Sequence, residues 1–159
     1  MGIFIDDLVV DFDHLDPSVL LQSWNWLVEP GNLPIMVTAM GDVFTRNTRD
    51  GSVHFLSVGA AAHCPIASDM TEFRGLLADE EFVRYYFDVK TITVLEEAGV
   101  KLGQKQLYGL EVPPVLGGKY ELPNVLPTDI LVHFTVTGQI HRQVKDLPPG
   151  TKITGFEIL

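Results

Sequence analysis

The chain has 159 residues, the length of about one domain on a prior of one per ~150 residues. Its 21 acidic and 11 basic side chains give a formal net charge of −10, which argues against binding to nucleic acid phosphates. The single cysteine permits no internal disulfide, and neither a secretory signal nor an apolar run of ~18 residues occurs. We therefore expect one soluble, cytoplasmic domain over residues 1–159.

The N-terminal segment, residues 1–19, is acidic. No Lys or Arg occurs before Arg46, whereas seven acidic residues do. Five of them form the candidate partner-binding set: Asp6, Asp7, Asp11, Asp13 and Asp16. Charge of one sign favours a basic partner. The alternative, that the acidity only keeps the protein in solution, stays open.

A helix is predicted from Asp16-Pro17 to about residue 28. Asp16 is a suitable N-cap, and proline is common in the first turn. Apolar residues then recur at helical spacing up to Pro30-Gly31. Trp24 and Trp26 cannot share one face of such a helix, so one of them is free to contact a neighbour or a partner.

An antiparallel β meander is predicted next. Residues 33–40, 43–46, 52–58 and 61–66 are short and apolar, and the turn signals Gly41-Asp42 and 49–51 separate them. Within the last strand, His63 and Cys64 point to opposite faces and cannot pair as base and thiolate. We expect Cys64 to be a buried structural cysteine.

Three helices and two more strands complete the predicted fold. Ser68 or Asp69 caps the first helix, Asp79 caps the second, and the third covers about residues 90–98 before Gly99. Residues 100–128 are rich in glycine and proline; 129–137 alternate as in a strand, and 152–159 suggest a terminal strand. The fold class is α+β: an antiparallel meander with packed helices and a C-terminal strand pairing back to the sheet.

The stretch GQIHRQVKDLPPG, residues 138–150, contains groups that could do chemistry and groups that shape the backbone. Ile140, Val144 and Leu147 predict a short helical segment that the two prolines end. A small hydrolase that uses His133 and His141 on one polar surface is the catalytic alternative. No metal-ligand spacing and no cofactor motif occurs in the sequence.

Several segments together resemble a known bacterial family. The most specific are PPVLGG at residues 113–118 and VHFTVTGQIHRQVKDLPPG at 132–150. Over about residues 20–159 the chain is similar to the C-terminal domain of immunity proteins that neutralise DNase effectors of the type VI secretion system. The resemblance implies a non-catalytic protein without cofactor or metal, whose partner is a basic DNase effector toxin rather than nucleic acid or membrane.

The residues of the contact surface follow from that implied partner. The five aspartates would meet basic residues that the nuclease uses to hold DNA. Trp26 and Tyr86 are the expected aromatic anchors, because aromatic side chains dominate the energetics of interfaces. The oligomeric state is left open, as is a third possibility, a stand-alone ligand-sensing module.

Overall fold

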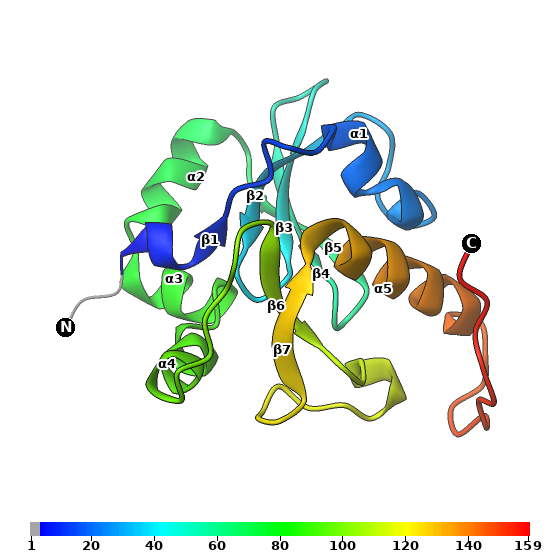
Figure 1. Cartoon of the computed structure of the whole chain (residues 1–159). Helices are drawn as coiled ribbons and strands as arrows, with labels where there is room; N and C mark the ends of the chain where they lie inside the picture. The colour runs from blue at the N-terminus through cyan, green and yellow to red at the C-terminus, as the bar shows by residue number, and fades with distance from the viewer. Residues whose placement is uncertain (1–3) are drawn as a thin grey trace.

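The computed structural model describes residues 4–159, so residues 1–3 of the predicted acidic segment lie outside the described residues. The described part of the chain begins with the 3-10 helix η1 and strand β1, followed by the helical turns α1 and η2, four strands, three helices, two further strands with η3 between them, and a last helix (Figure 1). The elements are η1 (Ile5–Asp7), β1 (Val9–Val10), α1 (Pro17–Leu20), η2 (Gln22–Trp24), β2 (Asn32–Thr38), β3 (Val43–Asn47), β4 (Val53–Ser57), β5 (Ala62–Ala67), α2 (Met70–Leu77), α3 (Glu80–Tyr86), α4 (Val89–Glu97), β6 (Gln106–Leu110), η3 (Pro114–Leu116), β7 (Val125–Asp129) and α5 (Ile130–Val144).

The predicted meander is confirmed. Strands β1 to β5 form one antiparallel sheet in chain order, and β6 pairs with β7 in a second, two-stranded sheet. The turn between β3 and β4 contains Gly51 at φ +75°, a backbone conformation that glycine adopts without strain. The α+β class therefore holds for the described residues.

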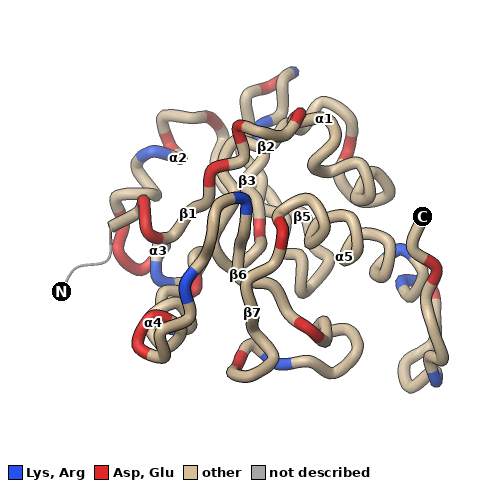
Figure 2. The backbone as a smooth tube through the Cα atoms, viewed as in Figure 1, with Lys and Arg blue, Asp and Glu red and all other residues tan. Residues whose placement is uncertain are grey.

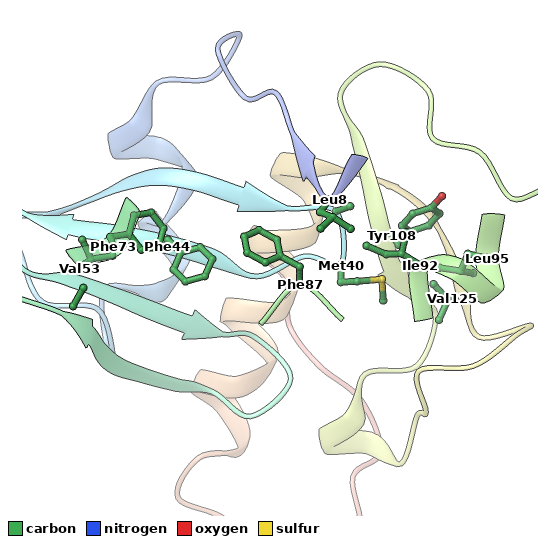
Figure 3. Packing of buried hydrophobic residues seen from close by; sticks show 12 residues of the cluster. Leu8, Met40, Phe44, Val53, Phe73, Phe87, Ile92, Leu95, Tyr108 and Val125 are labelled. Atoms are coloured by element: carbon green, nitrogen blue, oxygen red, sulfur yellow. The ribbon is translucent and has the colours of Figure 1, made fainter. Parts of the chain in front are cut away.

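Helices cover both faces of the five-stranded sheet. The neighbours Val43 and Phe44 in β3 point to opposite faces, and neither is exposed. Phe44 belongs to a core formed with α2, α3 and α4 (Figure 3), whereas Val43 belongs to a core formed with α1, η2 and α5. Figure 1 shows these two helical layers on either side of the strands.

The three predicted helices after the meander are confirmed, together with the caps Asp69 and Asp79 predicted for the first two. The carboxylates of Asp69, Asp79 and Asp88, the last of which the sequence reasoning did not single out, accept hydrogen bonds from the backbone at the starts of α2, α3 and α4. These bonds satisfy N–H groups that have no partner within the helix. Gly99 follows α4 at φ +77°, as a glycine after a helix commonly does.

The continuous helix predicted for residues 16–28 is wrong. Asp16 does cap α1, with its carboxylate 2.9 Å from the Ser18 N–H, but the helix ends at Leu20 and the 3-10 turn η2 follows. A continuous helix would turn the side chains of Trp24 and Trp26 about 200° apart, given ~100° per residue. The irregular turns stack the two rings, with centroids 5.6 Å apart, and bring both indoles to α5.

Residues 129–137 do not form the predicted strand, because they open helix α5. Asp129 caps this helix by accepting a hydrogen bond from the Val132 N–H at 3.0 Å. The buried positions recur at helical spacing, and Val132, which the strand would have buried, is 52% exposed. The buried residues are Ile130, His133, Phe134, Gly138, Ile140 and His141.

The predicted C-terminal strand is also wrong. Residues 152–159 contain no strand and pair with no sheet; hydrogen bonds from α5 hold this segment along the outside of the helix instead. Strands β6 and β7, which the sequence did not predict, lie in the glycine- and proline-rich region. The PPVLGG motif between them is a turn: Gly117 has φ +94°, and Gly118 packs against the backbone of Val112.

Candidate protein-binding surface

The N-terminal segment is fixed to the edge of the five-stranded sheet. Leu8 is buried, and its carbonyl accepts a hydrogen bond from the Ala39 N–H at 2.8 Å. The next residue, Val9, pairs with Thr38 of β2. The buried Leu8 side chain anchors the segment, while Asp6, Asp7 and Asp11 on either side of it remain exposed to solvent. The pairing with β2 therefore fixes the backbone that carries these charges.

A groove of about 850 Å³ runs between this segment and the chain that leads from α4 into β6. Its acidic lining consists of Asp6, Asp7, Asp11 and Glu96, and its basic lining consists of Lys101 and Lys105. Figure 2 shows acidic positions on either side of β1 and on α4, with basic positions on the approach to β6. Three of the five predicted aspartates therefore converge in one concave site, which we call the acidic groove. Glu96 was missed because only the fold brings it there.

The other two predicted aspartates lie outside the groove lining. The Asp13 N–H donates to the Asp11 carboxylate at 2.8 Å, which shapes the turn after β1. Asp16 is occupied as a helix cap, and hydrogen bonds from the Ser18 hydroxyl and N–H lower the pKa of its carboxyl. Both side chains stay exposed, so their role in partner binding remains a prediction.

The two predicted aromatic anchors are half-buried rather than fully exposed. Trp26 stacks on Trp24 and donates from Nε1 to the Gly138 carbonyl at 3.1 Å. Tyr86 packs on Phe82, with ring centroids 4.4 Å apart. A role in partner contact stays a prediction for both. Tyr85, which sequence reasoning did not single out, is 78% exposed beside Tyr86.

His133 and His141 do not share a polar surface, so the premise of the hydrolase hypothesis is wrong. Both are buried on the inner face of α5, two turns apart. His133 Nε2 lies 2.8 Å from the Gly41 carbonyl, and burial lowers its pKa to about 4. The ring of His141 packs against that of Trp24, with centroids 5.5 Å apart, and burial lowers the pKa of His141 as well. Both histidines serve the packing between α5 and the sheet.

The remaining candidate groups do not form a reactive or metal-binding cluster. Residues 4–159 contain no set of three or more His, Cys, Asp or Glu side chains placed to hold a metal ion. The predicted burial of Cys64 is wrong: its side chain is exposed, on β5 at the edge of the sheet. His54 and His63 stack at 5.0 Å, and His63 pairs with the Thr45 hydroxyl.

Another buried polar group was missed by sequence reasoning. Asp42 lies at the turn between β2 and β3, where the residue is half-buried and its carboxylate is enclosed by protein. This carboxylate accepts a hydrogen bond from the Val58 N–H at 2.9 Å. Burial, and secondarily the Asp88 carboxylate, raise its pKa to about 7. The bond joins the β2–β3 turn to the chain after β4, which indicates a structural role.

Comparison with solved structures shows a related fold. The chain resembles the protein in "Crystal structure of Atu4351 from Agrobacterium tumefaciens", with a TM-score of 0.53 and 18% sequence identity over 77% of this chain. The likeness spans 62% of that protein's length. A search of curated protein sequences finds no match. Over residues 4–159, every helix is too short or too polar to cross a membrane.

Residues 67–141 match the family described as T6SS immunity protein Tdi1, C-terminal. The matched segment runs from the end of β5 to His141 of α5 and includes the PPVLGG turn. It supplies Glu96, Lys101 and Lys105 to the acidic groove, whereas the groove's aspartates precede it. The resemblance seen in the sequence is thus confirmed: residues 67–141 of this chain are similar to the C-terminal domain of the T6SS immunity protein family Tdi1.

Proposed function

We propose that this protein is a cytoplasmic, non-catalytic immunity protein that neutralises a nuclease effector of a type VI secretion system by binding to it directly. The family match supports the immunity function, and the acidic groove carries the proposal of a basic partner. A nuclease holds the DNA backbone with lysine and arginine side chains. A protein that offers carboxylates to those side chains competes with DNA for them.

The shape and charge of the groove fit this task. Four carboxylates against two ammonium groups give the lining a negative excess, and the concave form lets a protruding basic loop approach several of them together. Charge complementarity of this kind accelerates encounter and selects the partner. Because exposed charges are screened beyond ~8 Å at physiological salt, binding should weaken as salt rises.

Neutralising the groove should slow association with the effector. For the triple variant Asp6→Asn, Asp7→Asn, Asp11→Asn we expect a fall in association rate on the order of 10-fold at low salt. Asparagine keeps the acceptor oxygen with which Asp7 and Asp11 receive local backbone hydrogen bonds. The measurement is stopped-flow binding to the cognate nuclease effector, at low and at physiological salt.

The matched control is Glu29→Gln, Glu111→Gln, Glu121→Gln, which changes the net charge equally at exposed sites outside the groove lining. It should keep most of the association rate. Equal slowing in both variants would show that net charge alone acts. Absence of any binding between the native chain and the effector at low salt would refute the proposed function.

A further inference from the structure

Two glutamine side chains on the outer face of α5 hold residues 157–159 through main-chain hydrogen bonds. Gln139 donates from Nε2 to the Leu159 carbonyl at 3.1 Å and accepts from the Leu159 N–H at 2.6 Å. Gln143 donates from Nε2 to the Glu157 carbonyl at 2.6 Å and accepts from the Glu157 N–H at 3.2 Å. Each side-chain amide therefore satisfies both polar groups of one residue, as a neighbouring β-strand would.

The spacing of the two glutamines explains this pairing. Residues four apart in an α-helix rise about 6 Å along the axis. Residues two apart in an extended chain span about 6.6–6.8 Å. Side chains at i and i+4 of α5 thus match alternate residues of an extended segment. We call Gln139 and Gln143 the glutamine pair.

The segment that occupies the glutamine pair contributes little through its own side chains at this point. Leu159 is fully exposed, and Ile158 is 48% exposed. All four hydrogen bonds reach backbone atoms of the segment. The bound residues follow Pro148-Pro149-Gly150 and contain no helix or strand. Recognition here depends on an extended backbone with free N–H groups, and hardly on sequence.

We propose that the glutamine pair is a docking site for an extended segment of a protein partner, and that residues 157–159 occupy it as a replaceable cis ligand. A groove of about 680 Å³ adjoins the pair, lined by Val19, Gln22 and Leu131 among others, and offers space for the side chains of such a segment. The site lies on the opposite side of the molecule from the acidic groove (Figure 1), so it is independent of the proposed function.

The test uses the full chain with its own segment released. In the variant Glu157→Pro, Leu159→Pro, both N–H groups that donate to the glutamine pair are lost without shortening the chain. A fluorescent peptide with the native sequence of residues 151–159 should bind this variant at least about ten-fold more tightly than the native chain. The tethered segment of the native chain competes at an effective concentration in the millimolar range.

Two peptide variants separate backbone recognition from side-chain recognition. Alanine in place of Glu157 and Leu159 keeps both N–H groups, and this peptide should bind as the native peptide does. Proline at the same two positions should abolish binding. Adding Gln139→Met and Gln143→Met to the Glu157→Pro, Leu159→Pro variant should also abolish binding of the native peptide. Adding Gln104→Met instead should leave this binding unchanged, because Gln104 is an exposed glutamine outside the site. Equal binding of the alanine and proline peptides, or retained binding without the glutamine pair, would overturn the proposal.

Discussion

Replacing Gly138 by alanine is expected to lower the free energy of unfolding by about 2–3 kcal/mol. An added Cβ at this position would lie 2.5 Å from the carbonyl oxygen and 2.8 Å from the carbonyl carbon of Ser23. That backbone cannot move aside cheaply, because the next residue, Trp24, is fully buried and donates from Nε1 to the Phe134 carbonyl at 3.0 Å. The measurement is urea unfolding followed by tryptophan fluorescence.

The size of the loss identifies its cause. Helix propensity alone favours alanine over glycine in a helix interior by about 1 kcal/mol, so any net loss must come from the contact between α5 and η2. The matched control is Gly75→Ala in α2, where an added Cβ meets nothing within 4 Å in the described part of the chain. This control should raise the stability by about 0.5–1 kcal/mol. Equal stabilisation by both substitutions would contradict the close helix packing.

The sequence predicted those parts of the fold that depend on neighbouring residues. The helix caps Asp69 and Asp79 act within three residues of their own position, and the turn at 49–51 joins adjacent strands. Short apolar runs between turn signals also identified four strands of the meander. Alternation failed at residues 129–137, because a helix that buries Ile130, His133 and Phe134 can carry the same apolar residues as a strand. Tertiary packing on Trp24 decides between the two.

The candidate site was predicted only in part, for a similar reason. The aspartates of the acidic groove stand out in the sequence as a run of one charge, and the structure keeps Asp6, Asp7 and Asp11 exposed together. Glu96 joins them only because β1 pairs with the edge of β2 and so approaches the end of α4. The glutamine pair could not be predicted, since residues 152–159 were expected to join the sheet.

The contribution of Asp42 to the free energy of unfolding should fall between pH 5 and pH 8. Its pKa is raised from 3.8 to about 7 in the folded state, so the native chain binds more protons than the unfolded chain in this window. This contribution is therefore greatest where Asp42 is protonated in the folded chain, and it is lost as the pH rises through about 7. The shift corresponds to a loss on the order of 3 kcal/mol between these limits. The measurement is urea unfolding at intervals of pH.

Buried histidines act in the opposite direction. The pKa of His133 and of His63 is lowered from 6.5 to about 4 by burial, so each must be deprotonated on folding. Their contribution rises from about pH 4 and levels off only above about pH 7.5, where the histidines of the unfolded chain have also lost their protons. Because two histidines oppose one carboxyl, the summed contribution of the three groups should be greatest near pH 7. The slope due to Asp42 therefore has to be read from a variant that lacks its carboxyl.

The variant Asp42→Asn isolates this slope. Asparagine keeps an oxygen for the Val58 N–H but carries no charge beside Asp88 and Tyr120, the other titratable groups whose charges interact here. Its added NH2 group costs about 1–3 kcal/mol if it finds no partner, so the absolute stability can change in either direction. The slope cannot be altered in that way, because the amide does not titrate. From pH 5 to pH 8 the stability of Asp42→Asn relative to the native chain should rise by about 3 kcal/mol, while that of the exposed control Asp11→Asn relative to the native chain should stay constant. Parallel curves for all three proteins would mean that the Asp42 carboxyl is ionised throughout and that its burial costs the fold nothing at high pH.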